Sequence, residues 1–144
     1  MHSEQFREFV REVRRRCTGV ESNIEAIEAI RATLATLSEC LPGATANELV
    51  GHLPMPGMLT SDLRQMEWAP GEQLSLPEFV LRVGQREGGI PGPAAREHAR
   101  TVLDLLRRSV DSKTFDRVLA GLPAGFESLF GADPTRVHMH QPIS

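Results

Sequence analysis

The fold is decided by the stretch 75-SLPEFVLRVGQREGGIPGPAAREHARTVLDLLRRSV-110. It begins with a capping box, Ser75-Leu-Pro-Glu78, in which the serine oxygen accepts from the glutamate N–H and the glutamate carboxylate reaches back. The apolar residues that follow recur every three or four positions, as on the inward face of a helix. Gly88-Gly89 interrupts this spacing, and a proline shortly afterwards favours the first turn of a second helix. We therefore predict helices over Leu76–Glu87 and Pro93–Val110.

The same pattern occurs earlier in the chain, offset by about 70 residues. Glu8-Phe9-Val10 aligns with Glu78-Phe79-Val80, and the alignment continues through one single-residue gap. Further matched pairs are Val13 with Val83, Arg16 with Arg86, Gly19 with Gly89, Arg31 with Arg100, Leu34 with Leu103, Leu37 with Leu106, and Leu53-Pro54 with Leu122-Pro123. Most of these are core-type apolar residues, glycines or prolines, which a duplicated fold retains. We therefore interpret the chain as two pseudo-symmetric helical repeats.

The first repeat predicts three helices with capped or broken ends. The first helix covers Phe6–Cys17 and is stopped by Gly19. The second, Ser22–Leu41, begins with a Ser-x-x-Glu capping box and is broken by Pro42-Gly43. A short third helix is expected to start at another capping box, Thr45-Ala-Asn-Glu48. The residues expected on the inward face of the second helix are Ile24, Ile27, Ile30, Leu34, Leu37 and Leu41.

These segments predict an all-α helical bundle of about six to eight helices, because no segment shows the sustained period-two alternation of a strand. The expected organisation is a single domain, 1–144, with a first helical repeat (4–66), a linker (67–75), a second helical repeat (76–130) and a loose tail (131–144). Each half has about 60 residues, near the lower limit for an independent core. We therefore expect the halves to bury their main apolar surface against each other. The leucines expected at this seam are Leu34, Leu37, Leu103 and Leu106.

The helix-packing residues of the second half resemble a known bacterial family. The motif reads Glu78-Phe79-Val80-x-x-Val83-x-x-Arg86-x-Gly-Gly, then Ala95-x-x-His98-Ala99-Arg100-x-Val102-Leu103-x-x-Leu106, then Leu122-Pro123 before Phe126. On these residues the chain is similar, over about residues 4–130, to the domain-of-unknown-function family DUF2267. The resemblance implies a domain of about six to eight helices from a bacterial cytoplasm. It implies no catalytic residue.

Charge and composition argue against several classes of protein. The formal net charge is −3 and the sequence pI is about 5.9, which is unlike a general nucleic-acid binder or a membrane-surface protein. No apolar run approaches the roughly 18 residues that a bilayer span needs. The start of the sequence, Met1-His2-Ser3-Glu4, lacks the pattern of a secretory signal. We therefore expect a cytoplasmic protein that makes no membrane contact.

The two cysteines, Cys17 and Cys40, do not predict a disulfide framework or a metal site. Both fall on apolar faces of predicted helices, and an antiparallel helix pair would hold them on the order of 20 Å apart. We therefore interpret them as buried free thiols. A redox sensor is the alternative, because three arginines, Arg14-Arg15-Arg16, precede Cys17.

No residue pattern predicts a catalytic, cofactor or metal site. His98 lies beside an inward helix face and is interpreted as a structural residue, with a general base as the alternative. His138-x-His140 has a spacing at which two imidazoles can bind a divalent metal, but two ligands make a weak site. Arg14-Arg15-Arg16 and Arg107-Arg108 invite a nucleic-acid interpretation. The glutamates of the first helix and the scarcity of aromatic residues oppose it.

Trp68 and Met66, at the start of the linker, are the candidate partner-binding residues. Tryptophan is enriched among the residues that contribute most to protein interfaces. A tryptophan at such a place more often fills the seam between two halves than forms an exposed contact. Both interpretations stay open at the level of the sequence.

The function that the sequence favours is a non-enzymatic, cytoplasmic helical interaction or regulatory domain with an unidentified protein partner. Grooves between pseudo-symmetric helical halves can take a partner helix. The alternatives are a nucleic-acid-binding protein, and a small-ligand-binding protein or enzyme with a pocket between the repeats. An exposed cleft that contains His98 with a carboxylate in reach would favour the enzyme, and a continuous arginine surface free of acids would favour nucleic acid. The sequence makes no prediction of the oligomeric state.

Overall fold

The computed structural model describes residues 2–122 and 125–130. Within those residues every regular element is helical and no strand occurs, so the predicted all-α fold is confirmed. Six α-helices have nine or more residues, and α4 is a single turn. The elements are α1 (His2–Arg16), α2 (Asn23–Cys40), α3 (Gly43–Gly51), α4 (Gly57–Thr60), the 3₁₀ helix η1 (Ser61–Leu63), α5 (Leu76–Arg86), α6 (Gly92–Ser109), α7 (Ser112–Ala120) and the 3₁₀ helix η2 (Phe126–Phe130).

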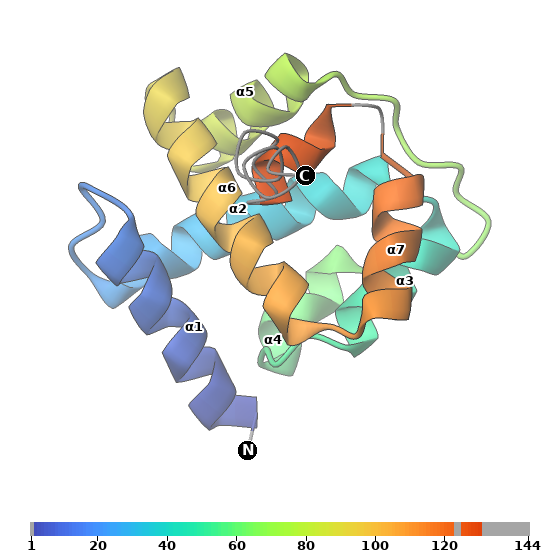
Figure 1. Cartoon of the computed structure of the whole chain (residues 1–144), viewed down its shortest axis with the longest axis horizontal. Helices are drawn as coiled ribbons and strands as arrows, with labels where there is room; N and C mark the ends of the chain where they lie inside the picture. Colours follow the sequence, from blue (N-terminus) through green and yellow to red (C-terminus); the bar gives the residue numbers. More distant parts are fainter. Residues whose placement is uncertain (1, 123–124, 131–144) are drawn as a thin grey trace, which may run out of the picture.

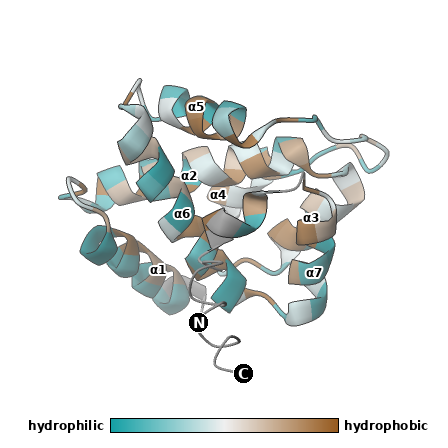
Figure 2. Ribbon diagram, turned by 45° about the horizontal axis from the view of Figure 1, so that its top comes forward, coloured by the Kyte–Doolittle hydropathy of each residue, from teal (hydrophilic) through white to brown (hydrophobic). Residues whose placement is uncertain are grey.

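The two 18-residue helices, α2 and α6, pack against each other at the centre of the bundle. α5 packs on both of them, and α1 also contacts both. α3 and α7 lie side by side at one end of the bundle, while α1 lies at the other end (Figure 1). Figure 2 shows mainly hydrophilic residues on the visible side of α1, as expected for a helix that covers one flank of the core.

Of the three helix starts predicted from capping boxes, two are confirmed by their capping hydrogen bonds. Ser75 Oγ accepts from the Glu78 N–H at 3.3 Å, and the Glu78 carboxylate accepts from the Ser75 N–H at 2.8 Å. At α2, Ser22 Oγ accepts from the Glu25 N–H at 3.1 Å. The Glu25 carboxylate reaches one residue further back than in a standard capping box, to the N–H of Glu21 at 2.7 Å.

The predicted start of α3 at Thr45 is wrong. The helix begins at Gly43, with Pro42 in the N-cap position and no side-chain cap. The Gly43 N–H donates instead to the carbonyl oxygen of Ala69 at 2.8 Å. Because a distant segment satisfies this free N–H group, the helix does not need the Thr45 hydroxyl as a cap.

A single cluster of buried side chains extends through both halves of the chain. It contains all four leucines expected at the seam, which are at most 1% exposed: Leu34, Leu37, Leu103 and Leu106. The prediction for Ile24 is wrong, because its side chain is 73% exposed. The inward face of α2 runs instead through Ala26 and Ala29, and Ile24 lies about 200° around the helix from Ala26.

No helix in the described part of the chain is both long enough and apolar enough to span a membrane.

Candidate partner-binding surface

The chain between η1 and α5 forms no regular structure but follows a defined path across the ends of α2 and α3. We call this segment, residues 64–75, the strap. Buried leucines lie at both ends of the strap, Leu63 just before it and Leu74 within it. Hydrophobic burial therefore holds both ends of the strap to the core.

Asn47, on α3, fixes the first part of the strap. Its side-chain Nδ2 donates to the carbonyl oxygen of Gln65 at 2.9 Å, and its Oδ1 accepts from the Gln65 N–H at 2.8 Å. An amide side chain that pairs with both main-chain groups of one residue acts like a neighbouring β-strand, so it fixes the position and the orientation of the backbone.

Two glycines let the strap approach the helices closely. A Cβ atom on Gly43 would lie 1.7 Å from the carbonyl oxygen of Met66, a distance that no side chain permits. Gly71 has φ +87° and its added Cβ would lie 2.7 Å from the carbonyl oxygen of Cys40. The strap therefore lies directly on the backbone at the junction of α2 and α3.

The centre of the strap is a tight turn from Met66 to Ala69. The Ala69 N–H donates to the Met66 carbonyl oxygen at 2.9 Å, which places Glu67 and Trp68 at the two central positions of the turn. Trp68 is 79% exposed and Met66 is 63% exposed. The turn thus presents two large apolar side chains to solvent from a backbone that is hydrogen-bonded to the helices.

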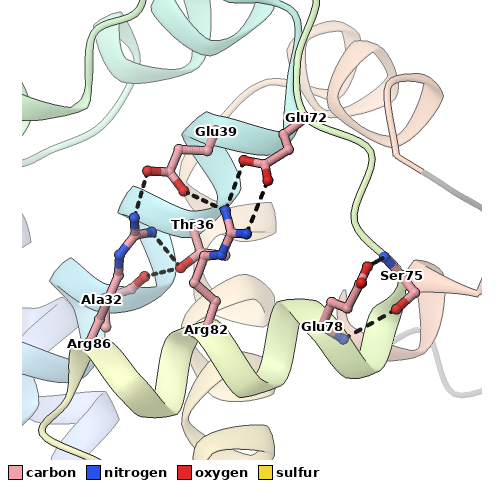
Figure 3. Close-up of polar contacts among 8 residues, drawn as sticks. All are labelled: Ala32, Thr36, Glu39, Glu72, Ser75, Glu78, Arg82 and Arg86. Atoms are coloured by element: carbon pink, nitrogen blue, oxygen red, sulfur yellow. Dashed lines mark hydrogen bonds and ion pairs between the residues drawn. The ribbon is translucent and has the colours of Figure 1, made fainter.

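An ion-pair network fixes the last part of the strap (Figure 3). The Glu72 N–H donates to the carbonyl oxygen of Glu39, on α2, at 2.7 Å. Arg82, on α5, donates from both Nη atoms to the Glu72 carboxylate at 2.8 and 3.0 Å, and also contacts the Glu39 carboxylate at 3.2 Å. This bidentate pair holds the pKa of the Glu72 carboxyl below its ordinary value.

Arg86 extends the same network along α2 (Figure 3). Its guanidinium donates to the Glu39 carboxylate at 2.5 Å and to the Thr36 hydroxyl at 2.9 Å. Thr36 Oγ1 in turn donates to the carbonyl oxygen of Ala32. Arg82 and Arg86 are one helical turn apart on α5, so one face of that helix is bound to α2 and to the strap together.

The exposure of Trp68 contradicts one of the two interpretations open from the sequence: Trp68 does not fill the seam between the halves. The seam is filled by leucines of α2 and α6, and the short path of the strap places the indole on the outer surface. Beside the turn lies a hollow of about 290 Å³, lined by Glu39 and Leu41 and by the strap residues Gln65, Ala69, Pro70, Gly71 and Glu72. The role of Trp68 and Met66 in binding a partner stays a prediction.

His98 has a carboxylate in reach but lies in no exposed cleft. Its Nδ1 is 2.9 Å from Oε1 of Glu87, and the two side chains are only 9% and 6% exposed. A buried, paired imidazole at the junction of α5 and α6 matches the structural role expected for His98. The combination that would favour an enzyme, a histidine and a carboxylate facing an open cleft, is not formed by this pair.

The arginine runs do not form an acid-free surface. Arg15 pairs with Glu12, and Arg14 donates to Asn23 and to the Glu21 carbonyl oxygen. The other arginines of the two runs share one buried carboxylate, Asp104, which is contacted by Arg16, Arg107 and Arg108 at 3.0 to 3.4 Å. The runs thus act largely within the fold.

Both cysteines are buried and unpaired, as predicted. Burial raises the pKa of the Cys17 thiol, which is also hydrogen-bonded to Thr101, and burial raises the pKa of Cys40 to about 12. A thiol with a raised pKa and no solvent access is a poor nucleophile, which opposes the redox-sensor alternative for Cys17.

The histidine pair of the predicted tail, His138 and His140, lies outside the described residues, as does the tail itself. Within 2–122 and 125–130, no three metal-ligating side chains gather in one place.

Sequence reasoning missed the residues that hold the strap in place. Arg82 and Arg86 carried a weak signal, because they are spaced by one helical turn and Arg86 aligns with Arg16 of the first half. Asn47 and Gly43 carried none, because their partners lie about 20 residues further along the chain and only the fold brings them together.

Comparison with models of known protein families gives a match over most of the chain. A family model described as "Uncharacterized conserved protein (DUF2267)" matches residues 6–129. No curated protein matches the chain.

Proposed function

We propose that this chain, which belongs to the DUF2267 family, is a non-enzymatic helical interaction domain. The description of the family specifies no chemistry, so the function is argued from the chain's own surface. The domain docks an unidentified protein partner through Trp68 and Met66 of the strap. The observation that carries this proposal is the 79% exposure of Trp68 on a turn whose backbone is fixed from both sides.

The physical support is the cost of exposing these side chains. A large apolar side chain that stays in water forgoes on the order of 1.5–3 kcal/mol of stabilisation by burial. A tryptophan that a fixed backbone keeps exposed to solvent therefore indicates an interaction surface. Binding through a flexible loop must also order that loop, whereas the strap is already ordered by Asn47, Gly43 and Arg82. Trp68 therefore has the properties of an interface anchor.

The hollow beside the turn supplies the second element of an interface. Its volume of about 290 Å³ can receive a side chain from the partner while Trp68 packs on the partner surface. The Glu39 and Glu72 carboxylates at its wall are neutralised by Arg82 and Arg86, so desolvating them leaves no unpaired charge.

We also propose that the domain is built from two pseudo-symmetric helical repeats. The support is the order and length of the helices: α1, α2 and α3 have 15, 18 and 9 residues, and α5, α6 and α7 have 11, 18 and 9. Further support comes from the aligned pair Arg16 and Arg86, which each cross to the long helix of the other half. Superposing α1–α2 on α5–α6 tests this part, and grossly different crossing angles would contradict it.

We place the protein in the cytoplasm. The support is the pair of buried, unpaired thiols, Cys17 and Cys40, which suits a reducing compartment. Location by fluorescence microscopy of a tagged chain tests this part of the proposal.

A small ligand between the halves remains the second candidate, and one observation favours it. A hollow of about 340 Å³ lies between α1 and the end of α6, with Glu12, His52 and Arg108 among its lining residues. Two of these three are already engaged, Glu12 with Arg15 and Arg108 with Asp104. The strap therefore remains the better-supported site.

The test compares partner capture by variants that keep the fold. Trp68→Ala and Met66→Ala remove the exposed anchors, and Ile24→Ala removes an equally exposed apolar side chain about 20 Å away along α2. All three should unfold at the wild-type temperature, because none of these side chains is buried.

We expect a protein captured by the wild type and by Ile24→Ala to be lost or reduced at least about tenfold with Trp68→Ala, a change of roughly 1.4 kcal/mol. A captured set that is identical for all variants would contradict the proposal. Binding of a labelled metabolite at the hollow near His52 would favour the second candidate.

A further inference from the structure

A second groove lies far from the strap, between α1 and the start of α2. Its volume is about 280 Å³. Its apolar lining comes from Phe6, Val10 and Ile27. Val10 is buried, and the other two side chains are partly buried against the core. The groove therefore has an apolar floor that the fold leaves open to solvent.

Three arginines of α1 line the same groove: Arg7, Arg11 and Arg14. None of the lining residues is acidic, whereas the hollows near His52, near Arg31 and beside the strap each have two acidic residues in their lining. The groove thus combines an apolar floor with a rim of a single charge sign.

The positive charge of the rim is only weakly compensated. Arg7 has no ion pair or hydrogen bond with any residue that the structure describes. Arg14 donates to two uncharged groups, the Asn23 side chain and the Glu21 carbonyl oxygen. Arg11 pairs with Glu8 at 2.8 Å, but both side chains are more than 60% exposed, so the pair contributes little.

We propose that this groove binds an acidic amphipathic helix of a partner protein. The arginines are spaced four and three residues apart, so they follow one line over two turns of α1, about 10 Å. A second helix that carries glutamate or aspartate at the same spacing can pair with all three and place its apolar face on the floor. The groove and the strap lie on different elements, so this inference does not depend on the proposed role of Trp68.

The apolar floor distinguishes this partner from a nucleic acid. A phosphate backbone would pair with the arginines but would leave Val10 and Ile27 against charged, hydrated groups. Exposed aromatic rings for base stacking are also lacking along the groove, because Phe6 is partly buried. Charge and apolar surface together fit an amphipathic peptide.

The experiment uses three probes with the full chain. The first is a fluorescein-labelled helical peptide of about 15 residues with glutamates at the arginine spacing and leucines on the adjacent face. The second is a scrambled peptide of identical composition, and the third is a duplex oligonucleotide of similar length. Fluorescence anisotropy at low salt should show the amphipathic peptide binding at least about tenfold more tightly than either control probe.

Two charge-matched variants locate the binding. Arg7→Glu with Arg11→Glu should weaken amphipathic-peptide binding at least about tenfold. Arg96→Glu with Arg100→Glu changes the net charge equally at exposed positions of α6 and should leave binding within about twofold of the wild type. Equal weakening by both pairs, equal binding of the two peptides, no peptide binding, or tighter binding of the oligonucleotide would each overturn the proposal.

Discussion

The sharpest prediction concerns Gly43, because one added methyl group tests whether the strap is held by main-chain contact. In Gly43→Ala the new Cβ would lie 1.7 Å from the Met66 carbonyl oxygen, whereas real Cβ atoms essentially never come within 3.0 Å of another atom. The obstacle is backbone on both sides, so rotation of a side chain cannot relieve it. The strap must therefore move away from α3.

The expected cost follows from the hydrogen bonds that this movement breaks. They are the bond from the Gly43 N–H to Ala69 at 2.8 Å and the two bonds between Asn47 and Gln65 at 2.9 and 2.8 Å. At about 1 kcal/mol each, the loss of these bonds lowers the stability of the fold by roughly 3 kcal/mol. Replacing a helical glycine by alanine stabilises the helix by about 0.5–1 kcal/mol and offsets part of this loss. We expect a net loss of about 2 kcal/mol, or a melting temperature lower by roughly 4–8 °C.

The assay is urea unfolding, with helical content followed by circular dichroism and the strap followed by the fluorescence of Trp68, the single tryptophan of the chain. Gly51→Ala is the matched control, because Gly51 ends the same helix and an added Cβ there meets nothing within 4 Å. The control should be as stable as the wild type or slightly more so. Equal stability of the two variants, with unchanged Trp68 anisotropy, would refute the close packing of the strap.

Three further predictions follow from the core and the network. Leu103→Ala should lower the free energy of unfolding by about 2–5 kcal/mol, because Leu103 is fully buried in the cluster that spans both halves. The variant should still unfold in one transition, and two separate transitions in denaturant would count against a shared core. Cys17 and Cys40 should react with a thiol reagent only after unfolding, because both are buried and their pKa values are raised. Rapid labelling of the native chain would contradict their burial. The pKa of Glu72 is lowered by Arg82, so its ionised form stabilises the fold above the ordinary value of 4.5 and this contribution is lost as the pH falls through the lowered value. The difference in unfolding free energy between the wild type and Glu72→Gln should therefore be constant near neutrality and shrink below about pH 4.5, and a pH-independent difference would argue against the ion pair.

Local signals in the sequence predicted the helices well. Ser75 and Glu78 form the expected capping box, and the helix ends lie within a few residues of the glycines and prolines that were expected to stop or start them. These features depend on groups a few residues apart, so the sequence alone specifies them.

The sequence failed where a distant segment supplies a partner. Thr45 was expected to cap α3, but the carbonyl oxygen of Ala69 satisfies the helix start at Gly43. Ile24 was wrong for another reason: it fits a helical apolar spacing, but the buried face of α2 runs through Ala26 and Ala29, and Ile24 lies on the opposite side of the helix. The same limitation hid Asn47, whose contact with Gln65 exists only after the strap has folded over α3.

Photocrosslinking from the strap tests the central claim, that Trp68 is a fixed contact for a protein partner. A photoreactive phenylalanine analogue replaces Trp68 in one sample of growing cells and Ile24 in another, and the crosslinked products are compared after irradiation. We predict one dominant protein adduct from position 68 that is absent from position 24 and is lost when Gly43→Ala displaces the strap. Adducts that are the same from both positions, or none from position 68, would contradict the account.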